Sequence, residues 1–321
     1  MMENSSVEEN NTVDWIAKEE GFSRPVSELI AIIVPLFIVP FVLSGNSAVL
    51  CAISKFKSLH KVAYYLLGNL AIADITTAIT LLIRCIFNLL NRLDINHCMT
   101  NQFFATVATG SSLSGTLIVC LHSFFAVRFP EQFRSGFTVK VAALLVIGSW
   151  SGWSFVSVIG LFTNNKEFQS AENCNVFSGN FNYTYATFVC ILVQLHLLLL
   201  VFFQVSTVYL IKRKEASLRA QAGQGNPSTA VSLNKLKKMS SVVGIVTVIL
   251  IFTLIAYVPI STAALLYMYC DSCEITQQHM ALMSVFIIPN MISNVIIYFL
   301  KSGEFNKLLP KVCKRHQVNP A

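Results

Sequence analysis

Residues Phe286–Tyr298 read FIIPNMISNVIIY, an apolar run that carries two asparagines. Asn290 and Asn294 are four residues apart, so in a helix they share one face. Lipid offers an amide no hydrogen-bond partner, and both side chains are therefore expected to face the interior of a helical bundle. The stretch predicts a membrane-spanning helix whose polar face needs partners on other helices.

The composition of the whole chain agrees with a membrane protein. Of the 321 residues, 54% are hydrophobic and 12% are charged, whereas soluble domains carry about 25% charged residues. The net charge of +7 would suit a nucleic-acid partner in a soluble protein. Here the basic residues lie in short segments between apolar runs, as the charge bias of membrane proteins requires. We expect a lipid bilayer as partner and no nucleic acid.

Seven apolar stretches are long enough to cross a membrane, for which about 20 residues are needed. The sequence therefore predicts an all-α membrane protein, a seven-transmembrane helix bundle. The expected spans are Leu29–Ser54, Val62–Leu90, Cys98–Val127, Val141–Thr163, Tyr183–Ile211, Met239–Tyr269 and Ile275–Leu300.

The distribution of basic residues orients these spans. Lysines and arginines crowd the segments after the first, third, fifth and seventh spans, and few lie on the other side. This bias predicts an extracellular N-terminus. Residues 1–27 then form an extracellular tail, 28–301 the seven-helix bundle and 302–321 a cytoplasmic tail. Three glycosylation sequons, at Asn4, Asn10 and Asn182, fall on the outer side.

Two inner segments have recognisable patterns. Residues Ala220–Thr229 contain Gly, Pro and polar residues and predict a flexible loop flanked by basic helical extensions. Residues Glu304–Leu309 predict a short amphipathic helix after the seventh span. Cys313 follows among basic residues, which makes it a candidate for acylation.

An ordered set of landmarks runs through the spans. It comprises Gly45-Asn46, the Leu70–Asp74 segment LAIAD, Cys98, Trp150, Pro259, and Asn294 with Tyr298. The set resembles the rhodopsin-like (class A) G-protein-coupled receptors. Within that class, the segments Arg134–Thr138, Asn182-Tyr183 and Cys270–Cys273 look most similar to adenosine receptors. The resemblance implies a plasma-membrane receptor that binds an extracellular small molecule and activates a heterotrimeric G protein, and that is not an enzyme.

The resemblance also implies a polar centre. In the family, an aspartate of the second span, a serine of the third and asparagines of the first and seventh surround a sodium ion. A hydrogen-bond network that only ties the helices together is the alternative. No other cofactor is expected. The matching residues are Asp74, Ser112, Asn46, Asn290 and Asn294.

Two pairs of cysteines lie on the expected outer, oxidising side, where disulfides are chemically permitted. A bond between Cys98 and Cys174 would pin the second outer loop over the mouth of the bundle. Cys270 and Cys273 form either a local bridge or free thiols.

The outward halves of the spans are expected to form the ligand pocket. Arg84 lies ten residues after Asp74, toward the outside. Its cation would hold an anionic or carbonyl-bearing ligand, reach the outer interface, or pair with an outer acid. Ala105 stands where amine receptors carry their aspartate, and no lysine lies in the seventh span for retinal. The candidate ligand-binding residues are Arg84, Gln102, Ala105, Thr106, Thr109, Phe177, Tyr257, Ser261 and Ile288.

Several positions depart from the adenosine-receptor pattern. Ala264 replaces the asparagine of the sixth span, Ile288 replaces the histidine of the seventh, and Tyr257 replaces the family tryptophan. Adenosine is therefore doubtful as the ligand.

The inner switch departs from the family as well. The chain has His122-Ser123-Phe124 where the family has Asp-Arg-Tyr, so the arginine that holds the inactive state is missing. Val295 replaces the proline before Tyr298, and we expect a straighter helix there. Pro259 is expected to kink the sixth span.

Two functions follow from these departures, and a third, from a different class, is the rival to a receptor. The first is a receptor with altered basal activity, and the second is a signalling-poor orphan, decoy or partner in a homo- or heterodimer. The third is a small transporter or channel, for which internal repeats or several intramembrane charges would be expected. The predicted spans hold only Asp74 and Arg84 as charges. Scattered histidines, without a nucleophile–base arrangement, argue against an enzyme.

Overall fold

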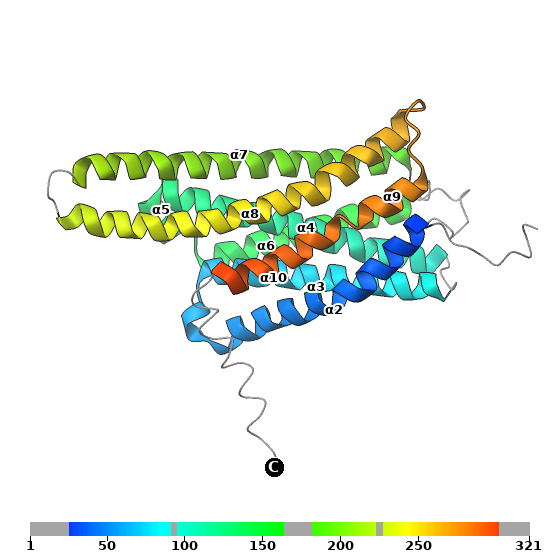
Figure 1. The fold of residues 1–321 in the computed structure, drawn as a ribbon, viewed down its shortest axis with the longest axis horizontal. Helices are drawn as coiled ribbons and strands as arrows, with labels where there is room; N and C mark the ends of the chain where they lie inside the picture. The colour runs from blue at the N-terminus through cyan, green and yellow to red at the C-terminus, as the bar shows by residue number, and fades with distance from the viewer. Residues whose placement is uncertain (1–25, 91–94, 164–181, 223–226, 302–321) are drawn as a thin grey trace, which may run out of the picture.

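The computed structural model describes residues 26–90, 95–163, 182–222 and 227–301. These residues form helices and no strand (Figure 1). The elements are α2 (Val26–Lys55), the 3₁₀ helix η1 (Lys57–Leu59), α3 (Val62–Leu89), α4 (Ile95–Arg128), α5 (Pro130–Gly136), α6 (Val139–Phe162), α7 (Tyr183–Ala222), α8 (Pro227–Tyr269), α9 (Gln277–Ser284) and α10 (Ile287–Lys301).

Six of these helices are long and apolar enough to cross a membrane: α2, α3, α4, α6, α7 and α8. Large apolar side chains on their outward faces are exposed, for example Phe41 at 74% and Leu198 at 66%. Continuous exposed apolar surface of this kind marks a membrane-contacting face.

The seventh predicted span is interrupted. The expectation of one helix over Ile275–Leu300 is wrong at Val285 and Phe286, which separate α9 from α10. The cause is Pro289, whose nitrogen has no hydrogen and whose ring clashes with the carbonyl four residues earlier, that of Val285. That carbonyl instead accepts a bond from the nitrogen of Ile288, at 3.1 Å. Through Val295, by contrast, α10 continues without a break, as the missing proline predicts.

Helix α4 lies at the centre of the bundle. Its most apolar window is 67% buried, whereas that of α6 is 17% buried. It contacts α3, α6, α7 and α8, while α2 lies beside α3 and α10, and α8 beside α7 and α10. The helices thus surround α4, and α6 packs on the outside of it.

Small residues explain why α4 takes the centre. Residues 110–116 read GSSLSGT, and small side chains let helices in a membrane approach closely. A methyl group at Gly110 would overlap the ring of Trp153, and one at Gly115 would meet Asn69 and Leu70. Neighbouring helices therefore use the space that α4 leaves.

Helices α7 and α8 are the longest, with 40 and 43 residues. At 1.5 Å per residue each spans roughly 60 Å, about twice the hydrocarbon thickness of a bilayer. They project beyond the other helices on the left of Figure 1. We call that end the inner end, and the end carrying Cys270 and Cys273 the outer end. Both helices extend into the predicted loop Ala220–Thr229, because α7 runs to Ala222 and α8 begins at Pro227.

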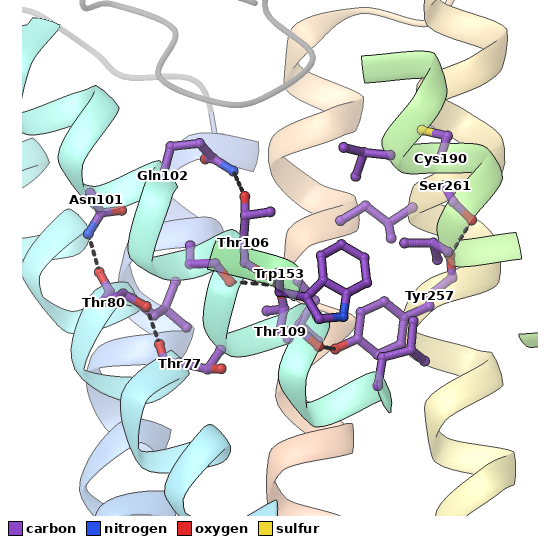
Figure 2. A pocket seen from close by; sticks show the side chains of 18 of the residues that line it. Thr77, Thr80, Asn101, Gln102, Thr106, Thr109, Trp153, Cys190, Tyr257 and Ser261 are labelled. Atoms are coloured by element: carbon purple, nitrogen blue, oxygen red, sulfur yellow. Dashed lines mark hydrogen bonds between the residues drawn. The ribbon is translucent and has the colours of Figure 1, made fainter. Parts of the chain in front are cut away.

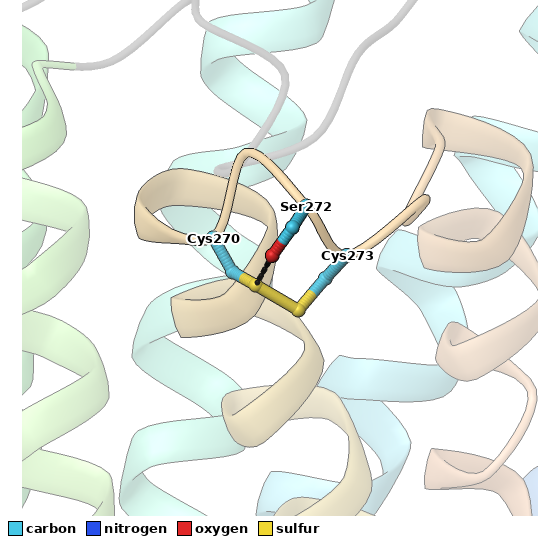
Figure 3. Close-up of a disulfide and its surroundings, with 3 residues drawn as sticks. All are labelled: Cys270, Ser272 and Cys273. Atoms are coloured by element: carbon cyan, nitrogen blue, oxygen red, sulfur yellow. Dashed lines mark hydrogen bonds between the residues drawn. A yellow bond between two sulfur atoms is a disulfide. The ribbon is translucent and has the colours of Figure 1, made fainter.

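The cysteines and sequons are placed only in part. Cys270 and Cys273 are joined by a disulfide, with their Cα atoms 5.3 Å apart (Figure 3). Cys98 is also disulfide-bonded, while its predicted partner Cys174 lies outside the described residues. Asn182 is exposed before α7 and accepts a bond from the Thr184 nitrogen at 2.8 Å. Asn4, Asn10, the amphipathic helix 304–309 and Cys313 also lie outside the described residues.

Candidate functional site

A cavity of about 180 Å³ opens in the outer half of the bundle, between α3, α4, α7, α8 and the seventh span (Figure 2). Its volume is below the roughly 300–1,000 Å³ of sites for drug-sized ligands. Its walls are mainly apolar, and Arg84 is the charged side chain among them. The lining residues are Thr77, Thr80, Leu81, Arg84, Asn101, Gln102, Ala105, Thr106, Thr109, Gly110, Leu113, Trp153, Val189, Cys190, Val193, Tyr257, Ile260, Ser261, Met280 and Ile287.

Two aromatic rings define one side of the cavity. Trp153 of α6 reaches across α4 beside Gly110, and its indole nitrogen donates to the Ser114 hydroxyl at 2.8 Å. The Tyr257 hydroxyl donates to the Thr109 carbonyl at 3.3 Å. Figure 2 shows the two rings close together in the view. The tyrosine thereby links α8 to α4.

Hydroxyls and amides line the α3 and α4 side. Asn101 donates to the Thr80 carbonyl at 2.7 Å, and Gln102 donates to the Thr106 hydroxyl at 3.2 Å (Figure 2). Within the described part of the chain, Arg84 has no hydrogen-bond or ion-pair partner. The cavity therefore offers one uncompensated cation.

The polar centre lies on the inner side of the cavity. Asp74 accepts bonds from Ser112 at 3.4 Å and from the Asn294 amide at 2.7 Å. Asn290 instead accepts a bond from Thr253 of α8 at 3.0 Å. Asn46 donates to the Val42 carbonyl at 3.0 Å. Four helices, α3, α4, α8 and α10, thus join through side-chain bonds, and the Asn46 amide donates within α2 and not to Asp74.

The residues of the polar centre fit a sodium ion. The five predicted ligands are 0% to 3% exposed, and the side-chain oxygens of Asn46 and Asn294 have no hydrogen-bond partner. A buried carboxylate with nearby orphaned amide oxygens is the donor chemistry that a hard cation prefers. Among the described residues no cluster of three His, Cys, Asp or Glu side chains is present.

A second polar chain joins α6, α4 and α7. The Ser114 hydroxyl, which accepts from Trp153, lies 3.2 Å from the Nε2 atom of His196. The Nδ1 atom of His196 lies 2.8 Å from the Leu192 carbonyl. Since that carbonyl can only accept, Nδ1 carries a proton, and in a neutral imidazole Nε2 then accepts from Ser114. The histidine therefore has a structural role.

Helices α7 and α8 are linked by hydrogen bonds along their length. Gln194 donates to the Ser261 hydroxyl at 2.8 Å beside the cavity. Nearer the inner end, Gln204 donates to the Thr247 hydroxyl at 2.6 Å and the Val243 carbonyl at 3.0 Å. Gln204 is only 2% exposed, so it connects the two helices inside the bundle.

Neutral contacts occupy the place of the missing arginine. Ser123 is buried, Phe124 packs edge-on against Phe203 of α7 at 5.4 Å, and His122 packs edge-on against Phe133 and Phe137. The Lys214 ammonium donates to the Val127 carbonyl at the end of α4. The inner end is thus held without a side-chain ion pair between these residues.

The structure brings most of the predicted ligand residues together. Arg84, Gln102, Ala105, Thr106, Thr109, Tyr257 and Ser261 line the cavity. Ile288 does not: it packs against Val39, Val42, Ala78 and Met291. The break before α10 changes the register of the seventh span, and Ile287 faces the cavity instead. Phe177 lies outside the described residues.

The switch residues are placed on several helices. Pro259 lies inside α8, which bends in Figure 1. Tyr298 lies in α10. Trp153 and Asn101 were missed as site residues, because nothing in their local sequence marks them. Gly110 was the available signal, since it leaves room for a large ring.

The sequence comparisons define the class of protein. Residues 45–298 match the family model described as 7 transmembrane receptor (rhodopsin family). The chain therefore belongs to the rhodopsin family of seven-transmembrane receptors. It is a multi-pass membrane protein of a receptor family and not an enzyme.

Individual relatives match shorter segments. Olfactory receptor 52N2 of Homo sapiens is 30% identical over 102 residues, 31% of this chain and 32% of that protein. The 5-hydroxytryptamine receptor 1A-alpha of Takifugu rubripes is 28% identical over 210 residues, 62% of this chain and 50% of that protein. Olfactory receptor 4B13 of Mus musculus is 26% identical over 141 residues, 43% and 46% of the two chains. The chain thus spans between 32% and 50% of the length of these relatives.

A solved structure supports the fold over nearly the whole length. Squid rhodopsin superposes with a TM-score of 0.76 at 18% identity, covering 92% of this chain and 89% of that one. At that identity the likeness shows the fold alone. Because the relatives named above are olfactory and serotonin receptors, the narrower resemblance to adenosine receptors stays a prediction.

Proposed function

We propose that this protein is a plasma-membrane receptor, with its N-terminus outside, that binds a small extracellular molecule in the outer cavity and activates a heterotrimeric G protein. One observation carries the proposal. Ser261, Tyr257 and Thr253 are spaced four residues apart on α8 and share one face. The first two line the cavity, and the third bonds Asn290 of the polar centre.

This arrangement supplies a mechanical link from ligand to polar centre. A ligand that moves Tyr257 acts on the same helical face that holds Asn290, while Asn294 on α10 bonds Asp74. Pro259 removes a backbone hydrogen bond from α8 and gives the helix a bending point. Ligand binding then shifts the population toward a conformation in which the inner part of α8 swings outward and opens a G-protein site.

The cavity narrows the choice of ligand. Ala105 lines it where amine receptors carry an aspartate, so we propose that no cationic amine binds, although one relative is named a serotonin receptor. The adenosine likeness has no support in the cavity either, because neither Ala264 nor Ile288 lines it. We propose a ligand of another chemistry in a receptor fold that holds a sodium ion through Asp74.

A second function is favoured by Ser123, which is buried where the resembled family carries the arginine of its Asp-Arg-Tyr motif. A receptor without that arginine would bind ligand but signal poorly, as a decoy or dimer partner.

Cells that display an epitope-tagged receptor and carry sensors for each G-protein subtype distinguish the two functions. We expect signalling above that of mock-transfected cells, scaled to surface expression, and a weaker ligand response for Thr253→Val. A receptor that reaches the surface and activates no subtype, with any ligand of a screened library, supports the decoy function instead.

A further inference from the structure

Among the described residues that line the outer cavity, Arg84 is the charged one, and its side chain is only partly exposed. A cation at such a depth in a membrane protein is costly unless something compensates it. The structure shows no hydrogen bond or ion pair to it from the described residues. The five N–H donors of its planar guanidinium group therefore have no acceptor among the described residues.

A second cavity, of about 300 Å³, lies between α3 and α4 toward the outer end. Arg84, Thr80 and Asn101 line both spaces. The guanidinium thus stands on the wall that the two cavities share. His97 lines the second cavity as well, and none of the described residues that line either cavity is a carboxylate. The donors at this wall match an anion and offer nothing to an amine.

Away from its hydroxyl and amide side chains, the outer cavity has apolar walls. Leu81, Leu113, Val189, Val193, Ile260 and Met280 form walls of the same space. A ligand that fits must therefore carry one acceptor group at the α3–α4 end and an apolar body toward Trp153 and Tyr257. A phosphate dianion would need more than one cationic partner, whereas a carboxylate is matched in charge and in bidentate geometry by one arginine.

We infer that the outer cavity binds a small organic acid, whose carboxylate pairs with Arg84 and whose apolar body fills the space beside Trp153. Gln102 and Asn101 flank the carboxylate end and supply further amide donors. The inference rests on the proposed function for its physiological meaning, but binding itself is independent of G-protein activation. It names Arg84 as the residue that selects acids over their neutral analogues.

The test uses the purified full-length chain in nanodiscs of phosphatidylcholine, a lipid that brings no net anionic headgroup. The probes are butanoate, hexanoate and octanoate, each with its methyl ester and its alcohol, and the readout is the ligand-induced rise in Tm. We expect at least one acid to raise the Tm and to bind about tenfold or more tightly than its ester and alcohol. Loss of a charge-assisted pair should weaken binding roughly 10- to 100-fold.

Variants assign the effect to Arg84. We expect Arg84→Gln to bind acid, ester and alcohol alike, and Arg84→Lys to keep part of the preference for the acid. Lys140→Gln removes an exposed charge of the same sign from α6 and should leave binding unchanged. His97→Gln should change the affinity for the acid little, because we expect the acid to occupy the outer cavity, which His97 does not line.

Three results overturn the inference: equal binding of acids and their neutral analogues, acid binding that survives Arg84→Gln, and no Tm rise with any acid of the series. If adding phosphatidylserine to the nanodisc abolishes the effect of the acid, Arg84 binds a lipid headgroup instead. If acids bind but no G protein responds in cells, the inference stands and the proposed signalling function fails.

Discussion

Arg84 in the outer half of the bundle differs from the donor side chains Gln204 and Lys214 in the inner half in whether it has a hydrogen-bond partner. In the outer half, Arg84 faces a cavity and has no partner among the described residues. In the inner half, Gln204 and Lys214 donate to groups on neighbouring helices. An unpaired donor beside a cavity favours a ligand, whereas paired donors between helices favour one resting arrangement. Binding and restraint are thus carried by different ends of the same helices.

The close packing of Trp153 against α4 is tested by Gly110→Ala. We expect this substitution to have the largest effect of those proposed. The added methyl group would overlap the Trp153 ring, and relieving that overlap should cost about 3 kcal/mol. The measurement is the Tm in nanodiscs, together with binding in the outer cavity. Gly148→Ala is the matched control, because nothing lies within 4 Å of its added methyl group. Equal stability of the two variants would show that Trp153 does not depend on this contact.

The polar centre lies at the boundary between the two halves, and the sodium dependence of the protein's stability tests whether it binds an ion. If the polar centre holds a sodium ion, sodium chloride should stabilise the protein more than choline chloride at equal ionic strength, by about 1.4 kcal/mol at ten times the Kd. Asp74→Asn keeps the side chain's shape and removes its charge, so the difference should vanish. A variant that keeps the full sodium effect would leave the polar centre as a hydrogen-bond network alone.

The inner restraint is tested by Gln204→Leu. The change removes two hydrogen bonds between α7 and α8, together about 1 kcal/mol of net stabilisation of the resting arrangement. We expect basal G-protein activation to rise about fivefold, since about 1.4 kcal/mol corresponds to tenfold. Thr187→Val, which removes a bond to Tyr269 at the exposed outer end, is the control. Unchanged basal activity in Gln204→Leu would place the restraint elsewhere.

The smallest effect is expected away from both halves' functional groups. The Thr138 hydroxyl caps α6 by accepting from the Val141 nitrogen at 3.4 Å. Thr138→Ala should cost about 0.5 kcal/mol without altering sodium dependence, ligand selectivity or basal activity. A change in any of these three would mean that α6, which packs on the outside of α4, takes part in signalling.

Much of the fold follows from local sequence, and part of the site does as well. Spans of apolar residues and the spacing of Asn290 and Asn294 predict helices with one buried polar face. Seven of the nine predicted ligand residues line one cavity, because they recur on inward faces of the outer halves of the helices. The break before Ile287 was not foreseen, since Pro289 acts on a carbonyl one turn earlier and its effect depends on the surrounding bundle.

By itself, the sequence determined the membrane class, the number of apolar stretches and which side chains had to avoid lipid, because hydrophobicity and helix periodicity are properties of neighbouring residues. The tertiary structure decided which of those side chains meet. Asn294 bonds Asp74 across 220 residues of chain, whereas Asn290 bonds Thr253 and Arg84 is left facing the cavity. These outcomes depend on how closely the other helices approach α4. Gly110 and Gly115 permit a close approach, but the sequence alone does not show which helices make it. Partners distant in sequence are chosen by packing, and packing is settled only when the whole bundle is assembled.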